Sequence, residues 1–230
     1  MSDLYFAQLT VGEMQNFAYL IGSRSARECL VVDPAWAVDE LVDRAEADGM
    51  RVAGALVTHY HQDHVGGRIF GMEIEGLARL MARAPAPVHV NAYEADGVRK
   101  VTGLSESDLV RHESGDSLAL GGITVRLLHT PGHTPGSQCF LVEEAGAPGK
   151  LVSGDTLFLG SCGRVDLPGS DAAQMYDSLH NKLKKLPDDT VLYPGHFYAS
   201  EPYGSLGEQK RRNPYLRAAS LEDFLTFLGA

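Results

Sequence analysis

Short apolar segments separated by turn residues dominate the first quarter of the chain. β-rich segments cover 4–10, 17–21 and 29–32, and pairs such as Gly12-Glu13 and Gly22-Ser23 separate them. Runs of this length between turn signals predict strands. From 36 to 48 the apolar positions recur at helical spacing, with Gly49 at the C-cap position, which predicts a helix. Residues 52–57 form a nearly continuous apolar run, as expected for a buried strand.

Extended and helical patterns alternate along the rest of the chain. Residues 75–84 predict a helix, and 172–186 predict a longer one that Ser170 or Asp171 caps and Pro187 ends. A terminal helix is expected over 221–228. Further strands are expected at 88–90, 123–128, 138–142, 151–152 and 191–193. The predicted elements are strands at first and then strands interleaved with helices. This order predicts a single α/β or α+β domain over 1–230, with helices flanking packed sheets.

Charge and composition restrict the possible partners. The chain has 20 basic and 30 acidic residues and a net charge of −10. Because a phosphate backbone is bound through a basic face that releases counterions, we expect no nucleic-acid partner. The only dense basic run, 210–212, is more typical of a solvated helix face.

Cysteine usage and hydropathy indicate a compartment. The chain has three cysteines, an odd number, and they lie far apart at Cys29, Cys139 and Cys162. We therefore expect no disulfide framework, and we expect a reducing environment. The N-terminus lacks the pattern of a secretory signal. No uncharged apolar stretch approaches the ~18–20 residues of a membrane span. We therefore expect a cytoplasmic protein without a membrane partner. The oligomeric state stays open.

A dense group of potential metal ligands follows the strand predicted at 52–57. Residues 58–67 read Thr-His-Tyr-His-Gln-Asp-His-Val-Gly-Gly and contain His59, His61, Asp63 and His64. Imidazole nitrogen and carboxylate oxygen suit zinc and similar metals. If His59 and His61 continue the strand, their side chains point to the same side. A chance histidine-rich surface loop is the alternative, but four potential ligands directly after a strand favour a metal site.

Three later segments repeat the order of strand, turn and potential ligand. They end at His133, Asp155 and His196. Ligands at the C-terminal ends of several strands can converge on one crevice. Seven candidates are too many for one tetrahedral ion, so the sequence predicts a centre for two divalent metal ions.

The remaining histidines and Cys162 receive structural interpretations. His129 precedes a Pro-Gly turn that prevents a helical pair of ligands, so we expect it to pack or to support a ligand. His89, His112 and His180 have no ligand-like context. Cys162 lies close to Asp155 in sequence, but nothing marks it as an activated nucleophile.

The motif at 58–67 resembles the HxHxDH signature of the metallo-β-lactamase superfamily. Segments 130–134, 154–158 and 194–196 resemble its later motifs in the same order, so the resemblance covers nearly the whole chain. It implies a four-layer αββα sandwich with the metals at one edge. It also implies the ligand sets: His59, His61 and His133 for the first metal, Asp63, His64 and His196 for the second, and Asp155 as the bridge.

Within the superfamily the chain resembles glyoxalase II, the hydroxyacylglutathione hydrolase, at 14–20, 154–158, 162–164 and 207–217. This implies a metal-dependent hydrolase that attacks a small-molecule acyl thioester, glutathione-linked in that family, with a metal-bridging hydroxide. Asp63 and Asp155 would be catalytic, and Arg164 and Tyr198 would contact the substrate. The long helical C-terminal portion of glyoxalase II is mostly absent, and Asp166 stands where that family offers a tyrosine. The thiol carrier therefore stays open.

Two alternatives remain at this stage. From 163–166 through 222–225 the chain is also similar to the persulfide dioxygenases of the same superfamily, whose single iron would correspond to His59, His133 and Asp155. The ligands themselves do not separate the two activities. A non-enzymatic metal-binding module is disfavoured, because structural zinc sites are closed four-ligand cages. Zinc is the expected metal, with iron and manganese as alternatives. The role of 73–83, a predicted helical insertion, stays open, with shaping of the substrate entrance as one candidate.

Overall fold

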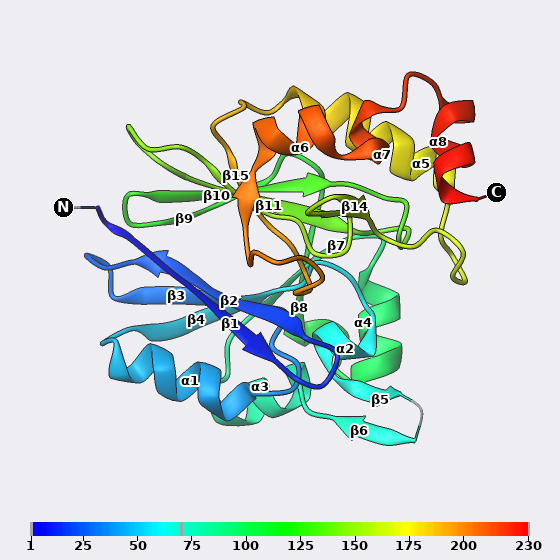
Figure 1. The fold of residues 1–230 in the computed structure, drawn as a ribbon. Coiled ribbons are helices and arrows are strands. Elements are labelled where there is room, and N and C mark those ends of the chain that lie inside the picture. Colours follow the sequence, from blue (N-terminus) through cyan, green and yellow to red (C-terminus); the bar gives the residue numbers. More distant parts are fainter. Residues whose placement is uncertain (1, 70, 230) are drawn as a thin grey trace.

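Two six-stranded sheets face each other in the computed structural model, which describes residues 2–69 and 71–229 (Figure 1). The first sheet has the order β1-β2-β3-β4-β7-β8 and consists of β1 (Leu4–Val11), β2 (Asn16–Ser23), β3 (Glu28–Val32), β4 (Arg51–Leu56), β7 (Val88–Asn91) and β8 (Leu109–His112). The second has the order β16-β15-β12-β11-β10-β9 and consists of β9 (Ser117–Leu120), β10 (Ile123–His129), β11 (Gln138–Glu144), β12 (Lys150–Val152), β15 (Val191–Tyr193) and β16 (Gly204–Ser205).

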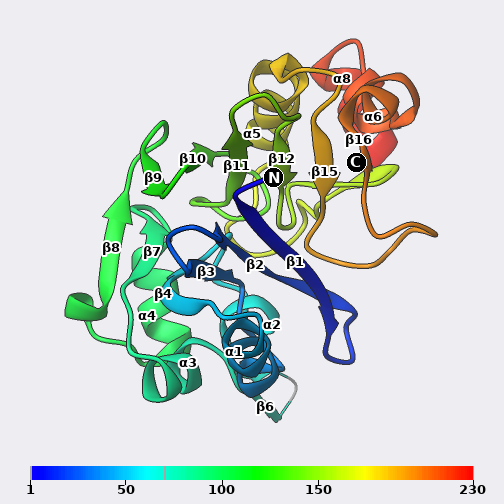
Figure 2. The ribbon, with the colours of Figure 1, turned by 90° about the vertical axis from the view of Figure 1, so that its left-hand side faces the viewer.

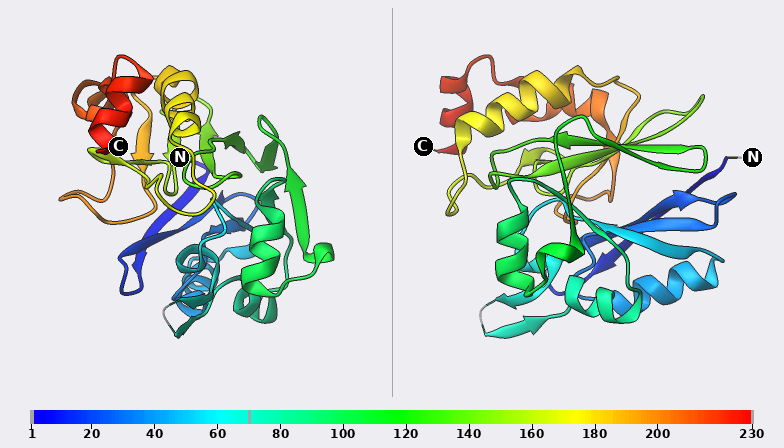
Figure 3. Two further views of the ribbon diagram at one scale, coloured as in Figure 1. Left: turned by 90° about the vertical axis from the view of Figure 1, so that its right-hand side faces the viewer. Right: turned by 180° about the vertical axis from the view of Figure 1, so that it is seen from behind.

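Helices cover the outer face of each sheet, as the side views show (Figures 2 and 3). The first sheet carries α1 (Val38–Ala47), α3 (Leu77–Arg83) and α4 (Ala95–Thr102). The second carries α5 (Ala172–Asp177), α6 (Leu206–Arg212), α7 (Pro214–Arg217) and α8 (Leu221–Leu228). The four-layer αββα sandwich expected from the sequence is therefore confirmed.

Strand β2 shows why the layers hold together. All eight of its residues are buried, because its two faces contact different apolar clusters. Phe17, Tyr19 and Ile21 lie between the sheets, whereas Ala18 and Leu20 lie under the helices of the first sheet. Successive side chains of a strand alternate between its faces. A run that is apolar at nearly every position thus marks a strand between two cores.

The small elements differ from the sequence expectation. Strands β5 (Gly67–Ile69) and β6 (Met72–Ile74) pair antiparallel, and α3 begins at Leu77, so only the later part of the predicted helical insertion 73–83 is helical. The helix expected over 172–186 is α5, which Asp171 caps, followed by a π-helical turn at Ser178–Lys182 and a 3₁₀ turn at Leu183–Lys185. The sequence reading did not predict α4, β8, β9, β16, α6, α7, the 3₁₀ turn at Glu106–Asp108 or the two-residue strands β13 (Leu157–Phe158) and β14 (Ser161–Cys162).

Candidate metal centre

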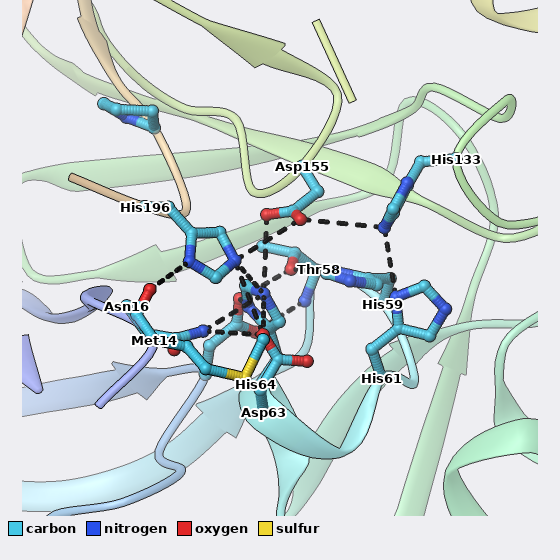
Figure 4. Close-up of polar contacts among 12 residues, drawn as sticks. Met14, Asn16, Thr58, His59, His61, Asp63, His64, His133, Asp155 and His196 are labelled. Atoms are coloured by element: carbon cyan, nitrogen blue, oxygen red, sulfur yellow. Dashed lines mark hydrogen bonds and ion pairs between the residues drawn. The ribbon is translucent and has the colours of Figure 1, made fainter. Parts of the chain in front are cut away.

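The seven predicted ligands meet at one edge of the sandwich (Figure 4). Each follows the C-terminal end of a strand: β4 leads to His59–His64, β10 to His133, β12 to Asp155 and β15 to His196. The crevice therefore takes ligands from both sheets.

The local backbone differs from the expectation for His59 and His61. Strand β4 ends at Leu56, and His61 is the N-cap residue of α2 (Gln62–Val65). Neither histidine continues the strand. Their side chains nevertheless converge, because the loop turns them toward His133: potential ligand atoms of these three histidines lie within 4.8 Å of one another. His61 Nδ1 is 3.0 Å from His133 Nε2.

A second group of three lies beside the first. His64 Nε2 and His196 Nε2 are 3.2 Å apart, and Asp63 Oδ2 is 3.4 Å from each of them. Asp63 and His64 belong to α2, so one short helix supplies two members of this group. Gly66, with φ of +87°, ends this helix in a conformation that favours glycine.

Asp155 lies between the two groups. Its Oδ1 is 3.4 Å from His64 Nε2, and its Oδ2 is 3.4 Å from His196 Nε2 and 3.6 Å from His133 Nε2. This is the position expected of a bridging carboxylate. The sequence-predicted residues are thus brought together as two neighbouring groups with a shared aspartate, and their roles as metal ligands remain predictions.

Hydrogen bonds behind the cluster orient four of the histidines. In each of them Nδ1 contacts an oxygen, which leaves Nε2 directed into the cluster. The partners are Thr58 Oγ1 for His59 at 3.0 Å, Asp33 Oδ2 for His64 at 2.9 Å, the Arg164 carbonyl for His133 at 2.8 Å and the Met14 carbonyl for His196 at 3.0 Å. Outer contacts of this kind set the tautomer and orientation of metal-binding histidines.

Asp33 is a supporting residue that the sequence reading missed. In the sequence it only follows the strand predicted at 29–32 and precedes Pro34. In the structure its carboxylate contacts His64 and accepts hydrogen bonds from the Thr58 backbone at 2.8 Å and the Thr58 hydroxyl at 2.6 Å. No spacing rule connects an aspartate to a histidine 31 positions later, so only the fold reveals the contact.

Two buried atoms of the cluster fit a metal centre. His59 Nε2 and Asp155 Oδ1 are buried and have no hydrogen-bond partner among the described residues. A buried polar atom without a partner costs free energy. A divalent cation would satisfy both atoms, and the donor set of imidazoles and carboxylates suits zinc and similar metals. The residues present therefore fit the expected metals.

The electrostatics of the cluster also favour positive charge. Burial opposes the charged form of His64 and His196, but Asp63 and Asp155 outweigh it and raise the pKa of His64 to about 9 and that of His196 to about 10. Burial likewise opposes ionisation of Asp155, yet His64 and His196 lower its pKa to about 2. The carboxylates thus create a place for cations.

A pocket of about 520 Å³ opens onto the cluster. Met14, Ile69, Phe158 and Leu167 supply apolar walls. Tyr198, predicted to contact substrate, lines the same pocket and stacks on His196 with ring centroids 4.6 Å apart.

Arg164 also lines the pocket, but its charge is already paired. The guanidinium donates to both carboxylate oxygens of Asp166, each at 2.8 Å. Cys162 lies in the same wall, and burial raises the pKa of its thiol to about 12. The expectation that Cys162 is not an activated nucleophile agrees with this environment.

The other histidines make structural contacts. His129 Nε2 donates a hydrogen bond to the Pro135 carbonyl, 2.9 Å away, and its ring stacks on that of Tyr93. His180 contacts the Tyr215 carbonyl at 2.9 Å. His89 and His112 form a pair that the sequence reading did not anticipate, with Nδ1 of the first 2.8 Å from Nε2 of the second.

Within residues 2–69 and 71–229, no helix has both the length and the apolar character needed to cross a bilayer.

Comparisons with known proteins agree with the geometry. The model of the family described as "Metallo-beta-lactamase superfamily" matches residues 11–196. The chain is 34% identical to the hydroxyacylglutathione hydrolase of Rhodospirillum rubrum, over 96% of this chain and 77% of that protein. It is 30% identical to the human mitochondrial persulfide dioxygenase ETHE1, over 93% of this chain and 76% of that protein. The crystal structure of ETHE1 from Myxococcus xanthus superimposes with a TM-score of 0.80 and 29% identity, covering 98% of this chain and 90% of the other.

Proposed function

This chain belongs to the metallo-beta-lactamase superfamily, and we propose that it hydrolyses acyl thioesters with the help of two divalent metal ions, most simply zinc. The observation that carries the proposal is the complete second group, Asp63, His64 and His196, beside the first, with Asp155 adjacent to both. This second group offers ligands for the second of the two metal ions, and the number of ions bound per chain distinguishes this proposal from a single-iron site.

The proposed chemistry divides between the metals and the chain. When bound, a pair of divalent cations supplies hydroxide at neutral pH and stabilises the charge that develops on the substrate. Asp63 lines the pocket, and its Oδ2 accepts a hydrogen bond from Asn16 Nδ2 at 3.0 Å. The nearby histidines His64 and His196 overcome the effect of burial and keep the pKa of Asp63 well below its usual range. Asp63 therefore stays ionised and can orient the attacking water by accepting a hydrogen bond from it.

A thioester suits the rest of the pocket. A thiolate leaves without a proton, whereas an amine or alkoxide needs an acid. Tyr198 is a poor acid here, because burial, together with Asp155 and Asp63, raises its pKa to about 12. The apolar walls around Phe158 and Leu167 suit an acyl chain or the carbon skeleton of a thiol.

The thiol carrier is open between glutathione and a neutral thiol. The hydroxyacylglutathione hydrolase relative supports a glutathione thioester. The ion pair of Arg164 with Asp166 weakens the case, because the guanidinium that would bind a substrate carboxylate already binds one within the chain.

A direct assay tests the proposal. The zinc-loaded protein should hydrolyse S-lactoylglutathione or another acyl thioester, and elemental analysis should find two metal ions per chain. Asp63→Asn replaces a proposed ligand of the second metal ion and the group that orients the water, so it should weaken binding of that ion and lower kcat by roughly 100-fold or more. No turnover of any thioester by protein with two bound zinc ions would refute the proposal.

Persulfide oxidation is the second candidate. It is favoured by the likeness to the two ETHE1 proteins, one of them a persulfide dioxygenase by name. His59, His133 and Asp155 would then hold one iron. Oxygen consumption with glutathione persulfide, together with one iron per chain, would select this activity over hydrolysis. A metal-loaded protein inert toward thioesters, lactams, phosphodiesters and persulfides would instead support a non-enzymatic metal-binding module.

A further inference from the structure

A buried carboxylate outside the ligand cluster connects two of its segments. Glu94 immediately precedes α4, and only 1% of its surface is exposed. Its Oε1 accepts hydrogen bonds from the Tyr60 backbone at 3.2 Å and from the Thr134 hydroxyl, and its Oε2 accepts one from the Gly136 backbone at 3.2 Å. No step of the proposed hydrolysis uses this residue.

The three donors belong to the segments that carry the first ligand group. Tyr60 lies between His59 and His61, and Thr134 directly follows His133. The carboxylate therefore bonds to the segment after β4 from one side and to the segment after β10 from the other. These two segments come from different sheets, and β4 and β10 are not paired with each other.

Close packing holds the carboxylate in place. A Cβ atom at Gly136 would lie 2.6 Å from the Glu94 backbone nitrogen and 2.8 Å from Oε2, so that position admits only glycine without a shift. A Cβ atom at Gly97 in α4 would lie 2.7 Å from the ring of Tyr60. The start of α4 is thus fitted tightly against both segments.

The second ligand group is held differently. Its helix α2 bonds to the segment after β3: the Trp36 indole donates to the Asp63 carbonyl at 3.0 Å, and the Ala35 backbone donates to the His64 carbonyl at 3.2 Å. Asp33 adds its contact with the His64 ring. Glu94 makes none of these contacts.

We propose that Glu94 is a positioning residue that fixes the segment 59–61 against the segment 133–136 and thereby raises the affinity of His59, His61 and His133 for their metal ion. The reason is geometric. His61 Nδ1 and His133 Nε2 approach each other only if the two segments keep their relative position, and metal affinity falls steeply when ligand geometry is relaxed. The inference depends on the metal centre but not on which substrate is turned over.

Two backgrounds isolate the ligand groups in the full chain. His196→Ala removes a member of the second group and leaves the first, whereas His59→Ala does the reverse. Glu94→Gln is then introduced into each background. Glutamine keeps the shape of the side chain, but its amide group replaces one of the two accepting oxygens, so the hydrogen bond with one backbone N–H is lost. The dissociation constant for Zn²⁺ is measured by competition with a chromophoric chelator. We expect it to rise at least tenfold in the His196→Ala background, in line with the effect of outer contacts, and less than twofold in the His59→Ala background.

Two further variants separate positioning from loss of stability. Thr134→Val removes one of the three donors and should weaken the first group by a smaller factor, with little added effect on top of Glu94→Gln. Tyr5 lies on β1, and its hydroxyl donates a hydrogen bond 2.7 Å long to Asp48, which is in neither of the two segments. Tyr5→Phe removes this hydrogen bond and should leave the Zn²⁺ dissociation constant unchanged. The Co²⁺ absorption spectrum of the first group should change with Glu94→Gln and not with Tyr5→Phe.

The proposal is overturned by any of three results. Glu94→Gln could weaken both backgrounds equally, it could weaken neither, or Tyr5→Phe could weaken the first group as much as Glu94→Gln does. Because the readout is Zn²⁺ binding, a failure to hydrolyse thioesters would not affect the inference.

Discussion

Arg164 and Asp166 show how one ion pair can change substrate choice at the residue scale. Both side chains are exposed, Arg164 lines the pocket, and its guanidinium binds the Asp166 carboxylate through two hydrogen bonds. Bidentate binding of this kind is what arginine offers to a carboxylate of a ligand. Asp166 therefore competes with any anionic substrate group for the same donors.

Freeing Arg164 should favour anionic thioesters. Asp166→Asn should raise the ratio of kcat/KM for S-lactoylglutathione to kcat/KM for an uncharged thioester by roughly twofold to fivefold, because an exposed ion pair contributes little and the variant also removes a charge that repels the anion. Steady-state kinetics with the two substrates measure the ratio. Glu40→Gln on the exposed face of α1 makes the same change in net charge and serves as the control. An equal change in this control would assign the effect to overall charge instead.

The burial of His89, which pairs with His112, should make the stability of the protein depend on pH. Burial, with a smaller contribution from His112, lowers the pKa of His89 to about 4. In the unfolded chain His89 titrates near 6.5, so between pH 6.5 and 4 the unfolded state binds more protons and the free energy of unfolding falls as the pH falls. Relative to His89→Gln, the metal-free protein should lose about 1–2 kcal/mol over this range, after a discount for the partial exposure of the ring.

Urea unfolding with a chelator present, repeated across this pH range, measures the difference. A free-energy difference between the two proteins that is constant from pH 7 to pH 4 would show that the imidazole titrates normally in the folded state.

The β5–β6 hairpin gives a prediction at the scale of elements. Ile69 on β5 lines the pocket, whereas Met72 on β6 is 44% exposed and does not. Ile69→Ala should raise KM for an acyl thioester severalfold with a smaller effect on kcat, because it removes about 1–2 kcal/mol of apolar contact with the substrate. Met72→Ala, in the same hairpin, should leave KM within twofold. Equal effects of both variants would show that hairpin stability, and not the contact of Ile69, matters.

Sequence patterns were informative for elements with a long buried face and silent for short ones. Strand β2 is apolar at nearly every position because both of its faces are buried, and helix α1 has helical periodicity because one of its faces packs against a core. Helix α4 has eight residues with Gly97 in its interior, and glycine lowers helix propensity. That glycine is present because the ring of Tyr60 lies against it. A tertiary contact, and not helix propensity, explains the glycine at position 97. Local propensity therefore could not reveal the helix.

At the scale of the whole molecule, the sequence indicated where chemistry gathers but not what supports it. The order of strand, turn and potential ligand recurs along the chain, and the ends of strands in a sandwich share an edge. The convergence of Asp155 and His196 on the first motif was therefore predictable. The contacts of Asp33, of Glu94 and of the Met14 carbonyl join segments that are distant in sequence. Only the packing of the two sheets brings them to the cluster.

This arrangement makes metal binding part of the stability of the fold. The candidate ligands follow strands of both sheets, so an unfolded chain cannot bring His133, Asp155 and His196 to the first motif and should bind metal far more weakly. A ligand that binds only the folded state adds RT ln(1 + [L]/Kd) to the free energy of unfolding, about 4 kcal/mol per site at a free metal concentration 1,000 times Kd.

Removal of metal with a chelator should therefore lower the free energy of unfolding by several kcal/mol. Each tenfold increase in free Zn²⁺ above Kd should restore about 1.4 kcal/mol per occupied site. Chemical unfolding in buffers of defined free Zn²⁺ measures this slope. In the double variant His59→Ala/His196→Ala the slope should fall toward zero, whereas His180→Ala, whose ring contacts the Tyr215 carbonyl away from the cluster, should keep it. A wild-type protein with no dependence on Zn²⁺ at any concentration would mean that these seven side chains do not hold a metal in the folded state.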